Sequence, residues 1–152
     1  RRQKNPLTDR FLTRIRESTG VEIIPSGRMA GKPVLRNLRK GKALGILPDV
    51  RSREKALTIQ FLGGRANVAA GMAMFARQTG VPIYPVVFTR HGWFHHQSAT
   101  FPPVLPDYTA DKETDFKRMT QEVMTHFEDY IRRCPDQYFW YNRRWVLDPV
   151  ND

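Results

Sequence analysis

The sequence predicts an α/β fold with a mostly parallel, mixed sheet flanked by helices, in a single domain over residues 1–152. Two observations predict this class. Segments with apolar residues every three or four positions, as in amphipathic helices, alternate along the chain with short apolar and β-branched segments that are typical of strands. One of these strand segments, residues 82–89, is almost continuously apolar, which indicates a strand covered on both faces near the centre of the sheet.

The first third of the chain is expected to contain two helices and two strands. Asn5 and Pro6 precede a run of periodically spaced apolar residues, which predicts an amphipathic helix that ends near Gly20. The next expected elements are a short strand at residues 21–24, a helix at 32–40 and an apolar strand at 43–47. Together these three elements predict a β-α-β unit, which is the building block of parallel sheets.

The remaining elements continue the alternation. Residues 57–62 are expected to be extended, and a helix-prone run follows at 67–78. After the apolar strand, residues 94–101 are expected to form its antiparallel neighbour, which makes the sheet mixed. Apolar residues at spacings of three and four then predict a long helix at 111–134.

The composition is that of an ordinary globular domain without disulfides. The 152 residues are 40% hydrophobic and 26% charged and contain a single cysteine, so a disulfide scaffold is excluded. The formal net charge of +10 arises in the first part, because residues 1–60 carry 15 Lys and Arg against 5 Asp and Glu, whereas residues 61–152 carry 10 of each kind. This one-sided basic charge suits an anionic partner, which can be nucleic acid, a phosphorylated lipid or an acidic carrier protein.

The sequence contains no complete catalytic or metal-binding constellation. His91, His95 and His96 could supply metal nitrogens, but no carboxylate lies within ten residues of them, and a solvated turn between strands is the favoured interpretation. His126 and Cys134 fit packing positions on the long helix better than the roles of base and nucleophile. Neither a metal nor a cofactor is therefore expected.

Three segments indicate more than core packing. An apolar strand ends directly in Asp49 and Arg51, at the place where open α/β sheets bind ligands; an exposed charged loop is the alternative interpretation. Gly63 and Gly64 would let the backbone approach a ligand, and the helix expected after them could offer N–H groups to an anion, although a plain turn fits equally well. The aromatic block at residues 137–145 contains paired arginines and suits a membrane interface, a base-stacking platform or simple core capping.

An ordered set of short motifs extends over nearly the whole chain. They are Arg1, Asn5-Pro6-Leu7 with Asp9, residues 35–49, Phe61-Leu62-Gly63-Gly64, Gly71, Thr79-Gly80-Val81-Pro82, Pro85-Val86, Arg90, and the ending with Pro135, Gln137-Tyr138, Trp140 and Arg143-Arg144. In this order they resemble the bacterial lipid A biosynthesis (late) acyltransferases, which are relatives of the glycerolipid and lysophospholipid acyltransferases. Two positions depart from that family's ending, because Asp136 replaces a Glu and Asn142 stands where a His is common.

The resemblance implies a membrane-associated acyltransferase with a glycerolipid-acyltransferase-like fold. Such an enzyme transfers a fatty acyl group from acyl carrier protein or acyl-CoA to a hydroxyl of an anionic glycolipid, such as a lipid A precursor, at the cytoplasmic face of the bacterial inner membrane. A lysophospholipid or a phosphatidylinositol mannoside is the alternative acceptor. The alternative of another class is a non-catalytic basic module that binds nucleic acid, a partner that the resemblance does not lead us to expect.

The resemblance also assigns site residues. The family's catalytic signature is a His with an Asp or Glu five positions later, and none of the four histidines here is followed by a carboxylate at that distance. The chain is therefore expected to be the C-terminal part of such an enzyme, truncated at the N-terminus, without the membrane helix and the dyad, and inactive by itself. Arg1 and Asp49 are expected to support the dyad, and Arg51 to contact a phosphate. The further residues expected to line the substrate site are Gly63, Gly64, Arg65 and Arg90.

Overall fold

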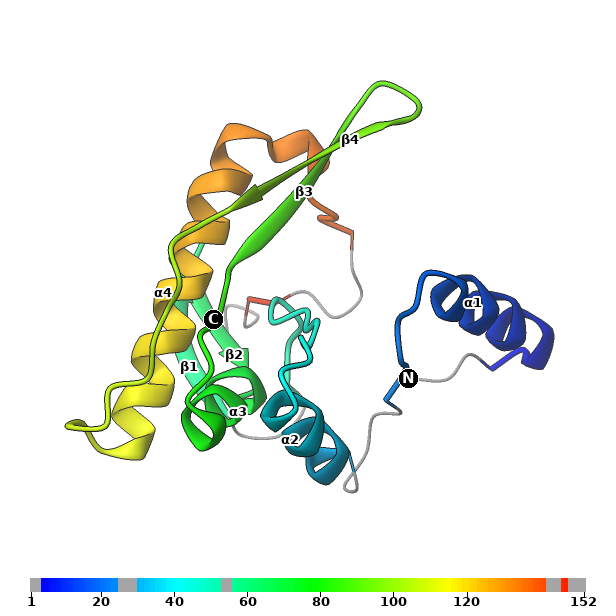
Figure 1. The fold of residues 1–152 in the computed structure, drawn as a ribbon. Helices are drawn as coiled ribbons and strands as arrows, with labels where there is room; N and C mark the ends of the chain where they lie inside the picture. The colour runs from blue at the N-terminus through cyan, green and yellow to red at the C-terminus, as the bar shows by residue number, and fades with distance from the viewer. Residues whose placement is uncertain (1–3, 25–29, 53–55, 142–145, 148–152) are drawn as a thin grey trace. The chain divides into compact units, whose positions relative to one another are not determined.

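The computed structural model describes residues 4–24, 30–52, 56–141 and 146–147 of the chain (Figure 1). Its elements in chain order are α1 (Pro6–Ser18), α2 (Gly31–Arg39), β1 (Leu57–Phe61), β2 (Gly64–Val68), α3 (Gly71–Thr79), β3 (Val86–His91), β4 (His95–Thr100), α4 (Lys112–Arg133) and the 3-10 turn η1 (Pro135–Gln137). They belong to two compact units, residues 1–44 and 45–152, and the single domain expected from the sequence stays a prediction. None of the helices in the described ranges is long and apolar enough to cross a membrane.

The first unit contains the two helices predicted for it. Asn5 caps α1, because its Oδ1 accepts hydrogen bonds from the backbone N–H groups of Leu7 at 2.9 Å and Thr8 at 3.4 Å. In α2 the side chains of Val34 and Leu38, which are four residues apart and share one face of the helix, are both buried. Local capping and apolar spacing were therefore sufficient to locate both helices.

The second unit begins its sheet structure with an antiparallel hairpin of β1 and β2. Its two turn residues, Leu62 and Gly63, have φ angles of 50° and 81°, which is the geometry of a type I′ turn and requires at least one residue tolerant of positive φ. The helix expected from residue 67 was placed too early, because this stretch begins as β2. Ala66 and Val68 alternate along β2 and are fully buried in a core shared with α4.

β3 and β4 form a second antiparallel hairpin, in which Arg90 lies opposite His96. The antiparallel neighbour predicted for the apolar strand is thus confirmed. The predicted place of that strand at the centre of a sheet is wrong, since in the described part of the chain β3 is hydrogen-bonded as a ladder only to β4 and its Phe88 is 72% exposed. An apolar run indicates that something covers a strand but does not say what covers it.

The mixed α/β class is confirmed, whereas the mostly parallel sheet is not found: both sheets of the described ranges are antiparallel pairs. The β-α-β prediction is wrong, because the backbone at residues 21–24 and 43–47 forms no strand. Short apolar segments become strands only where a second strand satisfies their N–H and C=O groups, and periodicity contains no information about that partner.

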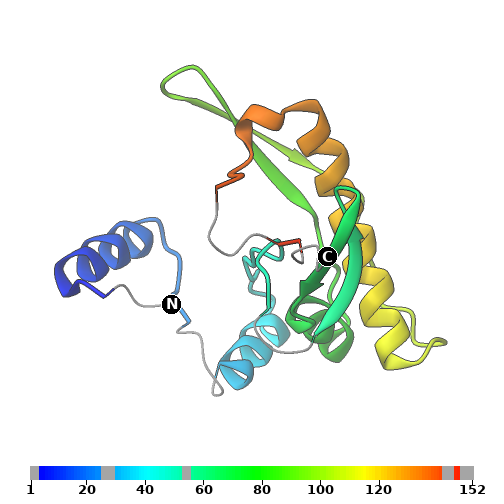
Figure 2. The ribbon, with the colours of Figure 1, turned by 180° about the vertical axis from the view of Figure 1, so that it is seen from behind.

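α4 is the long helix predicted at residues 111–134, with Asp111 as its N-cap and Cys134 as its C-cap. It lies beside α3 and the β1–β2 hairpin (Figures 1 and 2). Gln121 of α4 satisfies the edge of β1, because its Nε2 donates to the carbonyl of Gln60 at 2.9 Å and its Oε1 accepts from the N–H of Gln60 at 2.8 Å. α4 is therefore the scaffold on which the second unit is assembled.

A buried ion-pair network fixes the first turns of α4. Asp115 is fully buried and accepts hydrogen bonds from Arg77 Nη1 and Arg118 Nη2, each at 2.7 Å. Arg77 also donates to the carbonyls of Asp107 and Ala110, so one side chain joins α3, the loop before α4 and α4 itself. Burial acts to raise the pKa of Asp115, but hydrogen bonds from Arg118 and Arg77 outweigh it and hold the pKa below its usual value.

Candidate functional site

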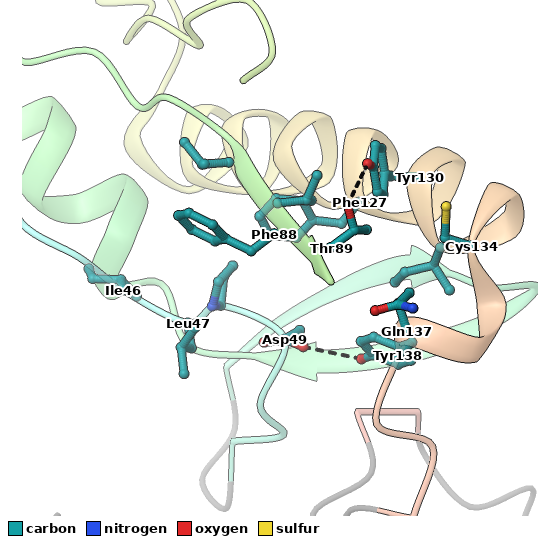
Figure 3. Close-up of a pocket in the computed structure, with 14 residues that line it drawn as sticks. Ile46, Leu47, Asp49, Phe88, Thr89, Phe127, Tyr130, Cys134, Gln137 and Tyr138 are labelled. Atoms are coloured by element: carbon teal, nitrogen blue, oxygen red, sulfur yellow. Dashed lines mark hydrogen bonds between the residues drawn. The ribbon is translucent and has the colours of Figure 1, made fainter. Parts of the chain in front are cut away.

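A cavity of about 300 Å³ lies in the second unit between β3 and the C-terminal half of α4 (Figure 3). Its wall is completed by residues 46–49 and by Gln137 and Tyr138, which follow α4. The lining side chains are mainly apolar, and the polar ones are Asp49, Thr89, Tyr130, Cys134, Gln137 and Tyr138. A largely apolar pocket with a few convergent polar groups is the usual form of a site for a small molecule or an acyl chain.

The rim of this cavity is apolar as well. Leu47 and Phe88 line the cavity and are nevertheless 82% and 72% exposed. Both side chains lie on the same side of the cavity, close to Ile46 (Figure 3). An apolar ligand entering here would remain in contact with apolar side chains from the rim inward, which favours a hydrocarbon chain over a polar metabolite.

Asp49 and Tyr138 meet at one end of the cavity (Figure 3). The Tyr138 hydroxyl donates a hydrogen bond to Asp49 Oδ2 at 3.2 Å, across 89 positions of sequence. Burial of the ring, together with the negative charge of Asp49 and this hydrogen bond, raises the pKa of Tyr138 far above its usual value of 10.0. The Tyr138 hydroxyl thus donates to Asp49 and gives its carboxylate a preferred direction at the cavity wall.

Tyr138 is itself held by its neighbours. Its ring meets Trp140 edge to face, with the ring centroids 5.2 Å apart. The Trp140 Nε1–H donates to the carbonyl of Pro135 at 2.6 Å. Within the described part of the aromatic block Trp140 thus supports Tyr138, whereas Phe139 and Tyr141 are 69% and 90% exposed.

Further contacts join β3 to the end of α4 beside the cavity. The Thr89 hydroxyl lies 3.4 Å from the Tyr130 hydroxyl and 3.2 Å from His91 Nε2, and the backbone N–H of Arg90 donates to Gln137 Oε1 at 3.2 Å. Because Thr89 is buried while its neighbours on β3 are not, these contacts fix the base of the β3–β4 hairpin at this point. The cavity is therefore enclosed by elements that hold one another in place.

Of the predicted site residues that the structure describes, one, Asp49, lies in the cavity wall. Asp49 lines the cavity, and Arg51, two residues further on, forms a β-bridge with Val68 and does not line it. Arg90 is exposed on β3, and its side chain makes no ion pair within the described ranges. Arg1 lies outside the described residues. The roles expected for these residues stay predictions.

Gly63, Gly64 and Arg65 lie at the turn of the β1–β2 hairpin and do not line the cavity. The helix expected directly after the glycines, with N–H groups available to an anion, is wrong, because the chain enters strand β2 at Gly64. Packing explains why a glycine occupies position 64, since a Cβ there would lie 3.2 Å from Cδ1 of Leu147. Their expected contact with substrate stays a prediction.

Sequence reasoning missed the partner of Asp49. In the sequence Tyr138 belongs to the aromatic block and to the family-like ending, and nothing local to it indicates a carboxylate 89 positions away. Thr89 and Tyr130 were interpreted as strand and helix positions. The three-histidine cluster lies on the β3–β4 hairpin, and no group of three or more potential metal ligands is found among the residues that the structure describes.

Residues 1–146 match the family model described as bacterial lipid A biosynthesis acyltransferase. Among curated proteins, a lipid A biosynthesis palmitoleoyltransferase of Escherichia coli (strain K12) and a lipid A biosynthesis acyltransferase of Shigella flexneri are each 25% identical over 154 residues. Each alignment covers 100% of this chain and 48% of the relative, so the chain spans about half the length of the curated relatives it matches.

Proposed function

We propose that this chain, which belongs to the bacterial lipid A biosynthesis acyltransferase family, forms part of the substrate site of a membrane-associated enzyme that acylates a lipid A precursor. The donor would be acyl carrier protein or acyl-CoA, and the acceptor a hydroxyl of an anionic glycolipid. The observation that carries the proposal is the apolar cavity with the Tyr138–Asp49 pair in its wall, in a chain matched by this family over 146 residues.

The cavity suits the fatty acyl group. Each methylene group that leaves water for an apolar environment contributes roughly 0.8 kcal/mol, so even a partly enclosed chain would be bound firmly. Leu47 and Phe88 at the rim would contact the chain where it enters, and Phe127 and Ile131 of α4 would contact it deeper in. The Tyr138–Asp49 pair lies at one end of the cavity, and the reacting carbonyl would be held at that end.

Asp49 would act on the polar end of the substrates. As an ionised carboxylate it is an acceptor only, so it can orient an imidazole N–H or an acceptor hydroxyl but does not itself supply an acidic proton. Since no histidine of these 152 residues has the spacing of the family's dyad, we assign Asp49, with Arg1, a supporting role and not that of the base. Tyr138 would fix the direction of the carboxylate.

The basic charge would bind the anionic groups of the acceptor and of the inner membrane's cytoplasmic surface. Fifteen of the 25 Lys and Arg lie in residues 1–60, where Asp and Glu number 5. Arg51 lies two residues beyond Asp49, and a guanidinium there could pair with a phosphate through two parallel hydrogen bonds. Each cationic side chain close to an anionic lipid surface contributes roughly 1 kcal/mol.

The experiment is an acyl-transfer assay with the full-length gene product that contains this chain. Asp49→Ala and Asp49→Asn are expected to lower turnover by at least about tenfold, which corresponds to about 1.4 kcal/mol of transition-state stabilisation, with thermal unfolding unchanged. Asp129→Asn removes an exposed carboxylate of α4 away from the cavity and should leave turnover unchanged. Wild-type turnover in both Asp49 variants would refute the assigned role.

The acceptor class is tested in the same assay. A lipid A precursor, a lysophospholipid and a phosphatidylinositol mannoside are offered in parallel with one acyl carrier protein donor and with the matching acyl-CoA. Transfer to the lipid A precursor at a clearly higher kcat/KM than to the other two is the expected result. A preference for either of the other acceptors would retain acyl transfer and overturn the choice of acceptor.

A further inference from the structure

The outer part of the β3–β4 hairpin is exposed on both of its faces. Every residue from Arg90 to Ser98 is exposed, whereas Thr89 at the base is buried. In both views the hairpin extends beyond the end of α4 and nothing else in the second unit lies beside its tip (Figures 1 and 2). A two-stranded ribbon is only marginally stable in water, so an uncovered hairpin of this length suits a role in contacting something else.

The tip carries two large aromatic side chains. Trp93 and Phe94 occupy the turn between β3 and β4, and they are 84% and 91% exposed. Two adjacent aromatic side chains with this exposure place a large apolar area in contact with water, and a turn does not require aromatic residues for its own geometry. Tryptophan has an apolar ring body and an N–H donor, and this combination favours the boundary between lipid headgroups and acyl chains.

The hairpin carries one arginine and no carboxylate, which suits an anionic partner. Arg90 and His96 are paired across the hairpin, and His91 and His95 are paired next to the turn. The sequence has no Asp or Glu anywhere between residues 55 and 106, so no carboxylate of the hairpin or its flanks opposes a negatively charged surface. Aromatic side chains at a tip ringed by basic and neutral polar groups complement an anionic phospholipid surface.

The hairpin is also continuous with the candidate site. β3 begins in the cavity wall, where Phe88 forms part of the apolar rim, and it continues through Arg90 to the tip. Phe88 and Arg90 are two positions apart on one strand and therefore face the same side of the hairpin. A surface that contacts Arg90 and the tip would thus also face the cavity rim.

We infer that the β3–β4 hairpin is a membrane-docking element, in which Trp93 and Phe94 insert into the interface of an anionic phospholipid bilayer and Arg90 contacts headgroup phosphates. Docking through the tip would direct the rim formed by Leu47 and Phe88 toward the lipids that supply the acceptor. The inference rests on the proposed function for its purpose, since an enzyme acting on a membrane lipid needs its site oriented to the bilayer. The hairpin's contact with lipid can nevertheless be measured independently of acyl transfer.

The direct test measures the depth of Trp93. The full-length gene product is reconstituted in vesicles of phosphatidylethanolamine and phosphatidylglycerol, with and without lipids brominated on the acyl chains, which quench nearby tryptophan. The emission of Trp93 is the difference between wild type and Trp93→Phe, and we expect bromination to reduce it by at least half. As a matched control, Leu105→Trp in the Trp93→Phe background places a tryptophan at another exposed apolar position, near the start of α4, where emission should be unaffected.

A second measurement separates docking from catalysis. The double variant Trp93→Ser with Phe94→Ser should transfer acyl groups about tenfold more slowly to an acceptor embedded in vesicles, and at the wild-type rate to an acceptor dispersed in detergent. Replacing the anionic lipid by phosphatidylcholine, or Arg90 by Gln, should weaken the quenching of Trp93.

Several results would overturn the inference. Unquenched Trp93 in a wild-type protein that is active on vesicles would remove the docking element and leave the proposed function intact. Equal loss of rate in detergent and in vesicles would assign the tip to the reaction or to folding. If the emission of Trp93 shifts without lipid, and the shift grows with protein concentration, the hairpin tip is a contact between two copies of the protein. If acyl transfer fails altogether while Trp93 is quenched, the docking element stands and the proposed function falls.

Discussion

Replacing Arg77 by methionine is expected to destabilise the second unit by about 3 kcal/mol. Methionine matches the unbranched stem of arginine as far as the Nε position and lacks the guanidinium. The variant therefore tests whether the buried network at the start of α4 holds α3 and the preceding loop in place. Arg77 is mostly buried, with a side chain only 12% exposed.

The magnitude follows from three hydrogen bonds that Arg77 donates. Two go to the carbonyls of Asp107 and Ala110, at 2.7 and 2.8 Å, and after the substitution water can replace them because these residues lie in a loop near the surface. The third, to Asp115 Oδ2 at 2.7 Å, serves a carboxylate that is fully buried. A charged hydrogen bond contributes roughly 1.5–3 kcal/mol. Arg118 and the N–H of Asp107 still donate to Asp115 in the variant, so the expected loss of unfolding free energy is limited to one charged hydrogen bond. Because this carboxylate is fully buried, we take the upper value of that range, about 3 kcal/mol.

Thermal and urea unfolding, followed by circular dichroism, measure the effect. For a chain of this size a loss of 3 kcal/mol lowers Tm by roughly 6–12 °C. Arg132→Met is the control, since Arg132 is 60% exposed and its pair with Glu128 is a surface ion pair expected to contribute less than about 1 kcal/mol. A Tm for Arg77→Met within about 2 °C of wild type, or an equal fall in the control, would show the network reasoning to be wrong. If the variant fails to fold, Arg77→Lys, which keeps the charge but not the planar fork, should give an intermediate Tm.

Two further predictions concern the site and the pH dependence of stability. Tyr138→Phe removes the hydrogen bond to Asp49 and should lower acyl transfer several-fold in the full-length protein with Tm within a few degrees of wild type, whereas wild-type kcat would show that Asp49 needs no fixed orientation. Burial acts to raise the pKa of Asp115, but the hydrogen bonds from Arg118 and Arg77 outweigh it, so the pKa is lower in the folded protein than in the unfolded chain. The ionised Asp115 therefore contributes its full stabilisation above the unfolded pKa, near 3.8, and this stabilisation is lost as the pH falls through the pKa of the folded protein. The urea concentration at half-unfolding should therefore decrease when the pH is lowered below about 4. Asp115→Asn should be less stable at pH 7, and its urea midpoint should depend less on pH in acid. If the midpoint of that variant depends on pH as steeply as that of wild type, the assignment to Asp115 is wrong.

The sequence by itself located α1, α2 and α4 and one hairpin. α1, α2 and α4 were predictable because their signals are local: Asn5 and Asp111 cap the first turn, and apolar residues repeat at the helical period within each segment. The antiparallel pairing of β3 with its neighbour was predictable because the two strands are joined by a short turn. The family resemblance was also available from the order of the motifs, and the match over residues 1–146 confirms it.

Only the tertiary structure decided which extended segments become strands and which polar groups share a site. Residues 21–24 and 43–47 have the composition of strands but find no partner in the described ranges, whereas residues 64–68, which begin at the second of two glycines, do. Asp49 was expected at the site as the carboxylate at the end of a strand, but residues 43–47 form no strand, and nothing in the sequence indicates its partner Tyr138. The pairing of Arg77 with Asp115 was likewise not predictable. Propensity, capping and periodicity act over a few residues, whereas these contacts join positions 38 and 89 residues apart, and they depend on how the whole second unit packs around α4.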